Sequence, residues 1–267
     1  MIKKIFYRDL LDLAMKDLSE AHLKQHFASA KFYLDNSKKE HKGQGAWSSL
    51  KKNDTLVYNN GMVSGKKHWV SGIPLCEWVI VPAMENNLAI MLLLDTKDIE
   101  VEPIPTVGME NTLTAHFACE KTPAVKLFER KDSRYWPGDR FCHLGFITNH
   151  LGISQALFSD ISEYAQQQDL NYIKKKVQLD IEILKMLWEE EVENSEEEEI
   201  DQNIFWQRRN RVYAFAKKTL IETVKLTTEL TSSGLYETTM SKHQRYKDSL
   251  IYSTHMCNIF TALKNII

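Results

Sequence analysis

The sequence predicts an α+β fold: short N-terminal helices, a middle antiparallel β-barrel or sandwich domain, and a C-terminal four-helix bundle. Apolar residues recur at helical spacing before residue 41 and again after residue 138, and short β-branched runs fill the stretch between. Five of the six prolines fall between residues 55 and 130, where they cannot break a long helix. We therefore place an N-terminal helical segment at 1–44, a β-domain at 45–130 and the bundle at 131–267.

The N-terminal segment is predicted to form one or two short helices. Leu10, Leu13, Leu18 and Ala21 recur near helical spacing, and neither proline nor glycine interrupts the first 40 residues. The stretch 41–49 then brings two glycines and two serines together, which predicts a loop. We regard this loop as a candidate part of a functional site.

The middle third is predicted to consist of short strands joined by turns. Runs of β-branched and apolar residues are bounded there by turn residues. Asn59-Asn60-Gly61 supplies a hairpin turn, because these residue types tolerate positive φ. The predicted strands are Thr55–Tyr58, His68–Ser71, Glu77–Pro82, Ala89–Leu94, Ile99–Glu102, Thr112–Cys119 and Val125–Phe128.

Four apolar stripes of helical period follow Pro137-Gly138. They predict four amphipathic helices that pack as an antiparallel bundle. Between the second and third stripes, residues 189–201 contain nine acids and no lysine or arginine, which predicts a solvated surface connection. The stripes cover residues 144–164, 170–188, 205–224 and 251–266.

Composition excludes several classes of function. Of the 267 residues, 43% are hydrophobic and 26% are charged, as in an ordinary globular protein. The formal charge is −2 and no segment interleaves basic with aromatic residues, so we expect no nucleic-acid partner. The longest apolar run, 88–94, is far shorter than the roughly 20 residues that span a bilayer. Charges near the N-terminus indicate a cytoplasmic protein without a signal peptide. Four scattered cysteines predict neither a zinc site nor a disulfide framework.

Three groups of residues occur in an order typical of one family. Ser64–Gly72 followed by Glu77–Ala83 is similar to a strand pair that reads N-G-x-K-x-W-I-[TS] and A-D-x-x-x-V-x-A. Val101–Met109 with Thr112–Thr114 follows a G-M-x-x-[ST]-x-[TS] landmark, and Gln244–Tyr252 looks like an R-D-A segment. Together they resemble the acyl-CoA dehydrogenase superfamily over residues 45–267. The first 44 residues would then be a shortened remnant of the family's N-terminal helical domain.

Two details look closer to the branch of the superfamily that includes flavin-dependent monooxygenases. They are Ser71-Gly72 and the histidine of Ser253-Thr254-His255. In this branch reduced flavin reacts with oxygen, whereas in the dehydrogenases the flavin takes a hydride from an acyl chain. The resemblance therefore implies a flavoprotein oxidoreductase and leaves both reactions open.

The resemblance implies an FAD or FMN cofactor and places Trp69, Val70 and Ser71 against the flavin. Residues two apart on a strand share a face, so the indole and the hydroxyl would stack on the ring and hydrogen-bond its edge. Ser49 and the neighbouring amides would meet the pyrophosphate, although the family's T-E-P-x-x-G-S motif is not kept. The alternative interpretation makes Trp69 an inward-facing core aromatic and Ser71 the end of a strand.

The position of the family's catalytic base falls on Met256, whose thioether cannot accept a proton at neutral pH. His255 beside it titrates in the right range and is the candidate catalytic residue. The alternative is a helix histidine with a structural role. We predict no metal site.

Two functions stay open. The first is a flavin-dependent oxidoreductase that acts on an acyl-CoA, or a two-component monooxygenase that acts on a small aromatic substrate. The second is a catalytically degenerate family member that acts as a scaffold or partner subunit. The missing base favours the second function, as does the replacement of the family's R-x-x-F-G arginine segment by residues 166–170. A curtailed N-terminal segment should leave the bundle with an exposed apolar face, which predicts a homodimer or homotetramer.

Overall fold

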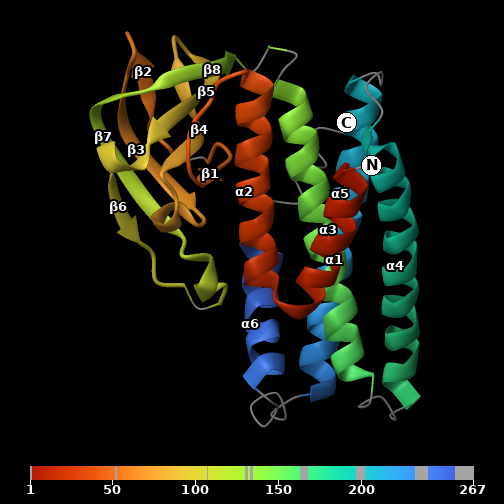
Figure 1. Ribbon diagram of the computed structural model, residues 1–267. Helices are drawn as coiled ribbons and strands as arrows, with labels where there is room; N and C mark the ends of the chain where they lie inside the picture. Colours follow the sequence, from red (N-terminus) through yellow and green to blue (C-terminus); the bar gives the residue numbers. More distant parts are fainter. Residues whose placement is uncertain are drawn as a thin grey trace. The chain divides into compact units, whose positions relative to one another are not determined.

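The computed structural model describes residues 2–51, 53–106, 108–129, 132, 135–162, 168–196, 202–231 and 240–255. They form two compact units (Figure 1). The sheet unit draws on residues 23–106 and 110–142, and the helical unit draws on 1–22, 107–109 and 143–267. Helices α2 and α3 contribute residues to both units. Boundaries between domains at residues 44 and 130 stay a prediction.

Each of the seven predicted strands overlaps a strand of the sheet unit. One further strand, β1, occupies part of the stretch 41–49 that predicted a loop. The strands are β1 Gly45–Trp47, β2 Val57–Asn59, β3 Met62–Val70, β4 Trp78–Glu85, β5 Leu88–Asp95, β6 Glu100–Pro103, β7 Ala115–Pro123 and β8 Val125–Glu129.

The strands form one mixed, open sheet, so the expected antiparallel barrel or sandwich is wrong. Their order is β6-β7-β3-β2-β4-β5-β8, with β1 beside β4, and no pairing among the described residues joins β6 to β8. Both β1 and β2 run parallel to β4. The chain reverses after β2 and again before β4, so these two strands point the same way. Alternation within single strands carries no information on this topology.

Strand β1 depends on a close approach between Gly45 and Trp78 of β4. A Cβ atom on Gly45 would lie 2.2 Å from the Trp78 ring, which only glycine avoids. The three residues of β1 pair with Trp78, Val79 and Ile80. Three residues are too few to show strand alternation, which explains why this strand was predicted as a loop.

The predicted hairpin turn is confirmed. Strands β2 and β3 are antiparallel with Asn59 opposite Met62, and Asn60 and Gly61 have φ values of 50° and 84°. Two successive positive φ values match the right-handed twist of the flanking strands. The turn therefore fixes the register of β3, which carries Trp69 and Val70, two of the four predicted cofactor residues.

Alternate residues of β4 and β5 build the core of the sheet unit. Val79, Val81, Ile90 and Leu92 are fully buried on one face, against which Phe27 of α2 packs. The opposite face of the same strands is also buried: Ile80 is 0% exposed and Met91 is 3% exposed. Both faces are covered, so these strands read as continuous apolar runs.

The helical unit contains α1 and three helices that overlap the first three predicted C-terminal stripes. Helix α6 reaches only the start of the fourth stripe, 251–266, and the rest of that stripe lies outside the described residues. Helix α4 packs against α5, and α5 packs against α6. None of the described helices is both long and apolar enough to cross a membrane. The helices are α1 Ile2–Lys16, α2 Leu18–Ser37, α3 Tyr135–Ile161, α4 Gln168–Glu193, α5 Gln202–Thr231 and α6 Met240–His255.

The first part of the acidic run is helical, so its prediction as a solvated connection is wrong there. Helix α4 continues to Glu193, and Glu191 is 2% exposed. Its carboxylate pairs with the guanidinium groups of Arg208 and Arg209 of α5. The two guanidinium groups balance the charge of Glu191, and the neighbouring Val192 is buried. The helix therefore extends into a stretch whose acidic side chains would by themselves disfavour it.

Candidate functional site

The sheet unit contains a buried ion pair between Lys67 of β3 and Asp54 of the loop before β2. The two charged groups lie 2.7 Å apart, and their side chains are 0% and 1% exposed. The Lys67 ammonium also donates to the carbonyl oxygens of Ser49 and His68. Asp54 accepts the backbone N–H groups of Lys51 and His68. The Lys67–Asp54 pair is therefore fully hydrogen-bonded and ties the loop to the strand.

Desolvation governs the protonation of this pair. Burial lowers the pKa of Lys67 to about 8, while the hydrogen bond that Lys67 donates to Asp54 and the charge of that carboxylate raise it. A lysine in such a position holds its neighbours in place rather than reaching into solvent.

The structure brings Ser49 and Trp69 together. The Ser48 hydroxyl oxygen lies 3.3 Å from the carbonyl oxygen of Trp69, and the Ser49 carbonyl oxygen lies 2.9 Å from Nζ of Lys67. Ser49 is partly buried and Ser48 is buried. Two residues that the resemblance assigned to the cofactor thus lie at one corner of the sheet unit. We call Ser48, Ser49, Asp54, Lys67 and Trp69 the lysine corner.

Trp69 has a strained backbone. Its φ is 60°, which a bulky residue rarely adopts. The register between β3 and β7 shifts between Lys67 and Val70, both of which are fully buried, whereas Trp69 is 38% exposed. A bulge therefore interrupts the alternation of the strand. The expectation that Trp69 and Ser71 share a face assumed regular alternation and is wrong.

Val70 and Ser71 are less accessible than Trp69. Val70 is fully buried, so only its backbone could meet a ligand, and Ser71 is 6% exposed. The Ser71 hydroxyl lies 3.1 Å from that of Thr114, which lies 2.8 Å from the hydroxyl of Thr112. Ser71 is thus part of a buried chain of hydroxyl groups.

Histidines flank Trp69. The Nδ1 atoms of His68 and His116 lie 3.1 Å apart. The Trp69 and His116 rings pack edge to face, with their centroids 5.8 Å apart. Burial and the neighbouring His68 lower the pKa of His116. Because one imidazole must donate and the other accept, at least one of the two rings is neutral.

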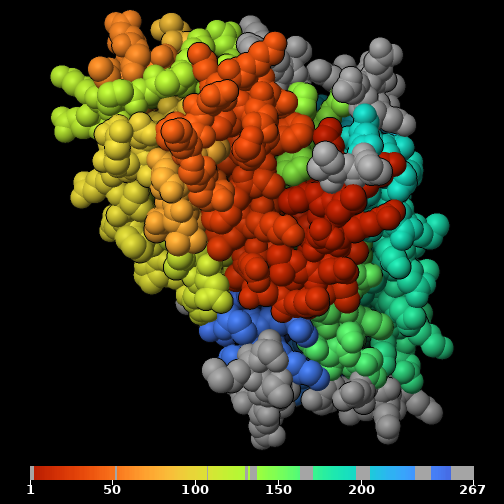
Figure 2. Space-filling view, in the orientation of Figure 1, coloured from red at the N-terminus to blue at the C-terminus, as the bar shows by residue number. Residues whose placement is uncertain are grey.

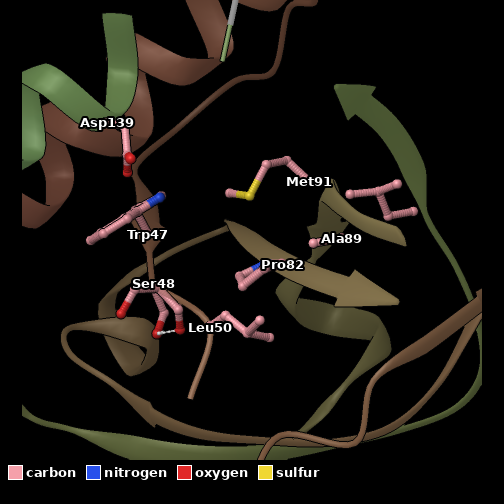
Figure 3. Close-up of a pocket in the computed structure, with 9 residues that line it drawn as sticks. Trp47, Ser48, Leu50, Pro82, Ala89, Met91 and Asp139 are labelled. Atoms are coloured by element: carbon pink, nitrogen blue, oxygen red, sulfur yellow. Dashed lines mark hydrogen bonds between the residues drawn. The ribbon is translucent and has the colours of Figure 1, made fainter. Parts of the chain in front are cut away.

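A cavity of about 300 Å³, here called the Trp47 pocket, lies beside the loop of the lysine corner. Figure 3 shows the Asp139 carboxylate and the Met91 thioether both directed toward the Trp47 ring. Tyr33 of α2 stacks on Trp47, and its hydroxyl lies 3.4 Å from the Asp139 carboxylate. The lining includes Trp47, Ser48, Ser49, Leu50, Pro82, Met91 and Asp139. It combines apolar side chains with two serines and one carboxylate, so it offers both apolar and polar contacts to a ligand.

The candidate base lies at the end of the described chain. His255 is the last residue of α6, and Met256 lies outside the described residues. The catalytic assignment of His255 therefore stays a prediction.

Two of the sequence landmarks meet in the helical unit. Asp248 of the Gln244–Tyr252 segment is 4% exposed and accepts the backbone N–H of Met109 at 2.6 Å. The same carboxylate accepts the Ser19 hydroxyl and the Gln244 amide. Burial raises the pKa of Asp248. The landmarks around Met109 and Asp248 thus form one contact, which gives the resemblance a structural basis.

Two histidines of α3 lie in the helical unit, His150 fully buried and His143 partly buried. His143 and His150 contact the ring of Tyr213 of α5, and His150 also contacts Tyr252 of α6. Nδ1 of His150 lies 2.6 Å from the Phe146 carbonyl oxygen and must therefore carry the proton. Burial lowers the pKa of His143 to about 3 and that of His150 to about 4. Both imidazoles are neutral at physiological pH.

Solved structures identify the fold, although no protein-family model and no curated protein sequence matches the chain. Glutaryl-coenzyme A dehydrogenase, solved with glutaryl-CoA, matches 99% of this chain and 79% of its own, at 10% identity and a TM-score of 0.82. The fold is acyl-CoA dehydrogenase-like. Dibenzothiophene monooxygenase (TdsC) from Paenibacillus sp. A11-2 matches 99% of this chain and 82% of its own, at 13% identity and a TM-score of 0.80.

A further acyl-CoA dehydrogenase-like neighbour has been solved with a reduced flavin. XiaF from Streptomyces sp., in complex with FADH2 and glycerol, matches 99% of this chain and 80% of its own, at 11% identity and a TM-score of 0.77. TdsC has also been solved in a complex with FMN and indole. At such low identities the likeness concerns the fold.

The sequence analysis missed Asp54, Lys67 and Asp139. Lys67 could have been found, because it stands between the apolar residues Val63 and Val70 in a predicted hairpin, where a buried lysine needs a counter-ion. Nothing in the local sequence identifies Asp54 as the counter-ion of Lys67. Asp139 follows Pro137-Gly138 directly, and the sequence analysis assigned it no role.

Proposed function

We propose that the chain is a flavin-dependent oxidoreductase of the acyl-CoA dehydrogenase superfamily, with FAD or FMN held beside Trp69. The observation that carries this proposal is the half-exposed indole of Trp69, held at positive φ by the buried lysine corner. Such backbone strain costs about 1–3 kcal/mol and persists mostly at functional positions. The likeness to flavin-binding proteins of this fold supports the proposal.

The residues present fit a flavin in part. Trp69 offers an accessible ring for stacking, and Ser49 offers a partly exposed hydroxyl. Ser71 would have to exchange its bond to Thr114 for one to the flavin edge, which a hydroxyl can do because it both donates and accepts. A bound flavin supplies the hydride or electron transfer, and this chain holds the ring and orients the substrate.

The Trp47 pocket favours a small aromatic substrate over an acyl-CoA. Its volume of about 300 Å³ is at the lower end for ligand sites. Trp47 and Met91 offer an aromatic face and a polarizable sulfur, and the Asp139 carboxylate would accept a hydrogen bond from a ring N–H or O–H. The FMN and indole complex of TdsC is in line with a substrate of this class.

One observation favours the alternative, a degenerate family member that acts as a scaffold or partner subunit. The Ser71 hydroxyl is 6% exposed and already bonded to Thr114. A flavin that lost this contact and the arginine missing from 166–170 would bind more weakly. The two functions therefore differ in whether flavin binds at all.

Replacing Trp69 by alanine is expected to weaken flavin binding more than replacing Ser71. Aromatic stacking contributes about 0.5–1.5 kcal/mol beyond buried area, and one neutral hydrogen bond contributes about 1 kcal/mol. Together they correspond to a roughly tenfold to hundredfold change in affinity. Equilibrium titration of FAD and FMN into Trp69→Ala, Ser71→Ala and the double variant measures the order of these effects.

Met62→Ala is the matched control for Trp69→Ala. Met62 is 45% exposed at the other end of β3, so its removal takes a similar exposed apolar side chain from the same strand. Equal flavin affinities of Trp69→Ala and Met62→Ala would argue against a flavin beside Trp69.

We expect no measurable acyl-CoA dehydrogenation with a dye acceptor. Met256 occupies the family's base position, and loss of a general base removes roughly 10²- to 10⁴-fold in rate. Met256→Glu should raise a weak rate if that position faces the substrate. Robust turnover of a straight-chain acyl-CoA by the wild-type protein would contradict both this expectation and the preference for a small aromatic substrate.

We also propose that α3, α4, α5 and α6 correspond to the family's four-helix bundle, and that the chain forms a homodimer or homotetramer. Exposed apolar residues on α4 support the second point.

A further inference from the structure

Two histidines on neighbouring strands of the sheet unit face each other. His68 of β3 and His116 of β7 are both partly exposed, and their Nδ1 atoms lie 3.1 Å apart. The register between these strands shifts between Lys67 and Val70, so that His68 and Trp69 together stand opposite His116. The bulge that contains the strained Trp69 backbone therefore also brings the two imidazoles together.

A carboxylate lies on the same face of the sheet as this pair. Glu102 of the edge strand β6 is the direct partner of His116, and directly opposed residues of two strands project to one face. Burial and the charge of His68 lower the pKa of His116, while the Glu102 carboxylate raises it. Figure 2 shows atoms of β6 and β7, in yellow and yellow-green, at the molecular surface. A small ion can therefore reach this face from solvent.

The distance between the two imidazole nitrogens fits one bound metal ion. Zn²⁺ binds imidazole nitrogen at about 2.0–2.1 Å, so two such nitrogens on a tetrahedral ion lie about 3.3 Å apart. The observed 3.1 Å between His68 and His116 is close to this value. Metals bind the neutral imidazole, and the lowered pKa of His116 keeps that ring neutral at physiological pH. The imidazole that donates its Nδ1 proton in the metal-free protein can carry it on Nε2 instead.

No metal site was expected from the sequence, because His68 and His116 are 48 residues apart and only strand pairing joins them. Nowhere in the described part of the chain are three metal-ligating side chains already gathered around one point. The exposed side chain of Glu102 must therefore turn toward the two imidazoles when an ion binds.

We propose that His68, His116 and Glu102 bind one divalent transition-metal ion, with Zn²⁺ as its physiological occupant. Two imidazoles and one carboxylate suit zinc and leave its fourth position to water. The ion joins β3, β7 and β6 beside the strained backbone of Trp69. This site goes beyond the proposed flavin chemistry and does not depend on it.

Calorimetric titration of Zn²⁺ into untagged protein, first treated with a chelator and desalted, tests the site. We expect saturable binding of one ion per chain. His68→Ala and His116→Ala should each weaken binding at least about tenfold, since changes even in the outer shell of a metal site weaken binding about 10- to 100-fold. Glu102→Gln should also weaken it. His41→Ala is the matched control, because His41 is a partly exposed histidine that pairs with Asp95 in the same unit, and it should keep the wild-type affinity.

Two further measurements identify the ligands. Cu²⁺ binds nitrogen and oxygen ligands more tightly than Zn²⁺ does, and electron paramagnetic resonance of its complex should show two nitrogen ligands in wild type and one in either histidine variant. Saturating Zn²⁺ should raise the melting temperature of wild type but not that of the variant with both His68→Ala and His116→Ala. Circular dichroism without metal reports whether each variant keeps its fold.

Three results would overturn the proposal. They are wild-type protein that binds no Zn²⁺ saturably, single histidine variants that keep the wild-type affinity, and a His41→Ala variant that loses as much affinity as they do. An affinity unchanged by Glu102→Gln would overturn the assignment of the carboxylate as the third ligand.

Discussion

Replacing Lys67 by methionine is expected to destabilise the protein by about 3–5 kcal/mol, the usual effect of removing one partner of a buried ion pair. The substitution keeps an unbranched chain of similar length, but it leaves the Asp54 carboxylate buried without its counter-charge. It also removes the donor to the Ser49 carbonyl oxygen. Urea unfolding of wild type and variant measures the difference in free energy of unfolding.

Lys66→Met is the matched control. Lys66 is the neighbouring residue of β3 and is exposed, so its removal should change stability by less than about 0.5 kcal/mol. Asp54→Asn added to Lys67→Met should recover part of the loss, because a buried amide costs less than an unpaired carboxylate. Equal effects of Lys66→Met and Lys67→Met would show that the Lys67–Asp54 pair does not hold the loop.

Acid is expected to destabilise the helical unit through two of its histidines. His143 and His150 have folded-state pKa values of about 3 and about 4, because burial penalises the charged imidazoles. In the unfolded chain they titrate near pH 6.5. Below that pH the unfolded state binds more protons, so stability is complete above pH 6.5 and declines as pH falls toward the folded-state values.

Within this window each histidine lowers the free energy of unfolding by about 1.4 kcal/mol for each unit that the pH falls. By about pH 5 the two histidines together have lowered the free energy of unfolding by about 4 kcal/mol. Free energies of unfolding from urea titrations followed by far-ultraviolet circular dichroism at several pH values give the slope. His150→Asn keeps a donor for the Phe146 carbonyl oxygen and should lower the slope by about one proton.

Local pattern was sufficient for most of the secondary structure. Local sequence alone predicts the conformation of apolar runs such as Leu88–Asp95 and of the Asn60-Gly61 turn, because side-chain period and φ are local properties. Pairing between strands is a property of the whole chain, which is why parallel β2 and β4 could not be predicted. Glu191 shows the same limit, since arginines of another helix stabilise α4 there.

The candidate site was predictable only in part. Trp69 and Ser49 were proposed through the resemblance, and the structure places both at the lysine corner. The bulge between Lys67 and Val70 follows from pairing with β7 and leaves no trace in the local sequence. Asp54 and Asp139 act through distant partners, and a carboxylate in a loop or at a helix start is too common to single out.

The central claim is that this chain binds a flavin, and titration of FAD and FMN fluorescence with the wild-type protein tests it most directly. The account predicts saturable quenching that approaches about one flavin per chain and is weakened in Trp69→Ala, since stacking on the indole both binds the ring and quenches its emission. Fluorescence of both flavins that stays unchanged up to high protein concentration would contradict the account and leave the scaffold function in its place.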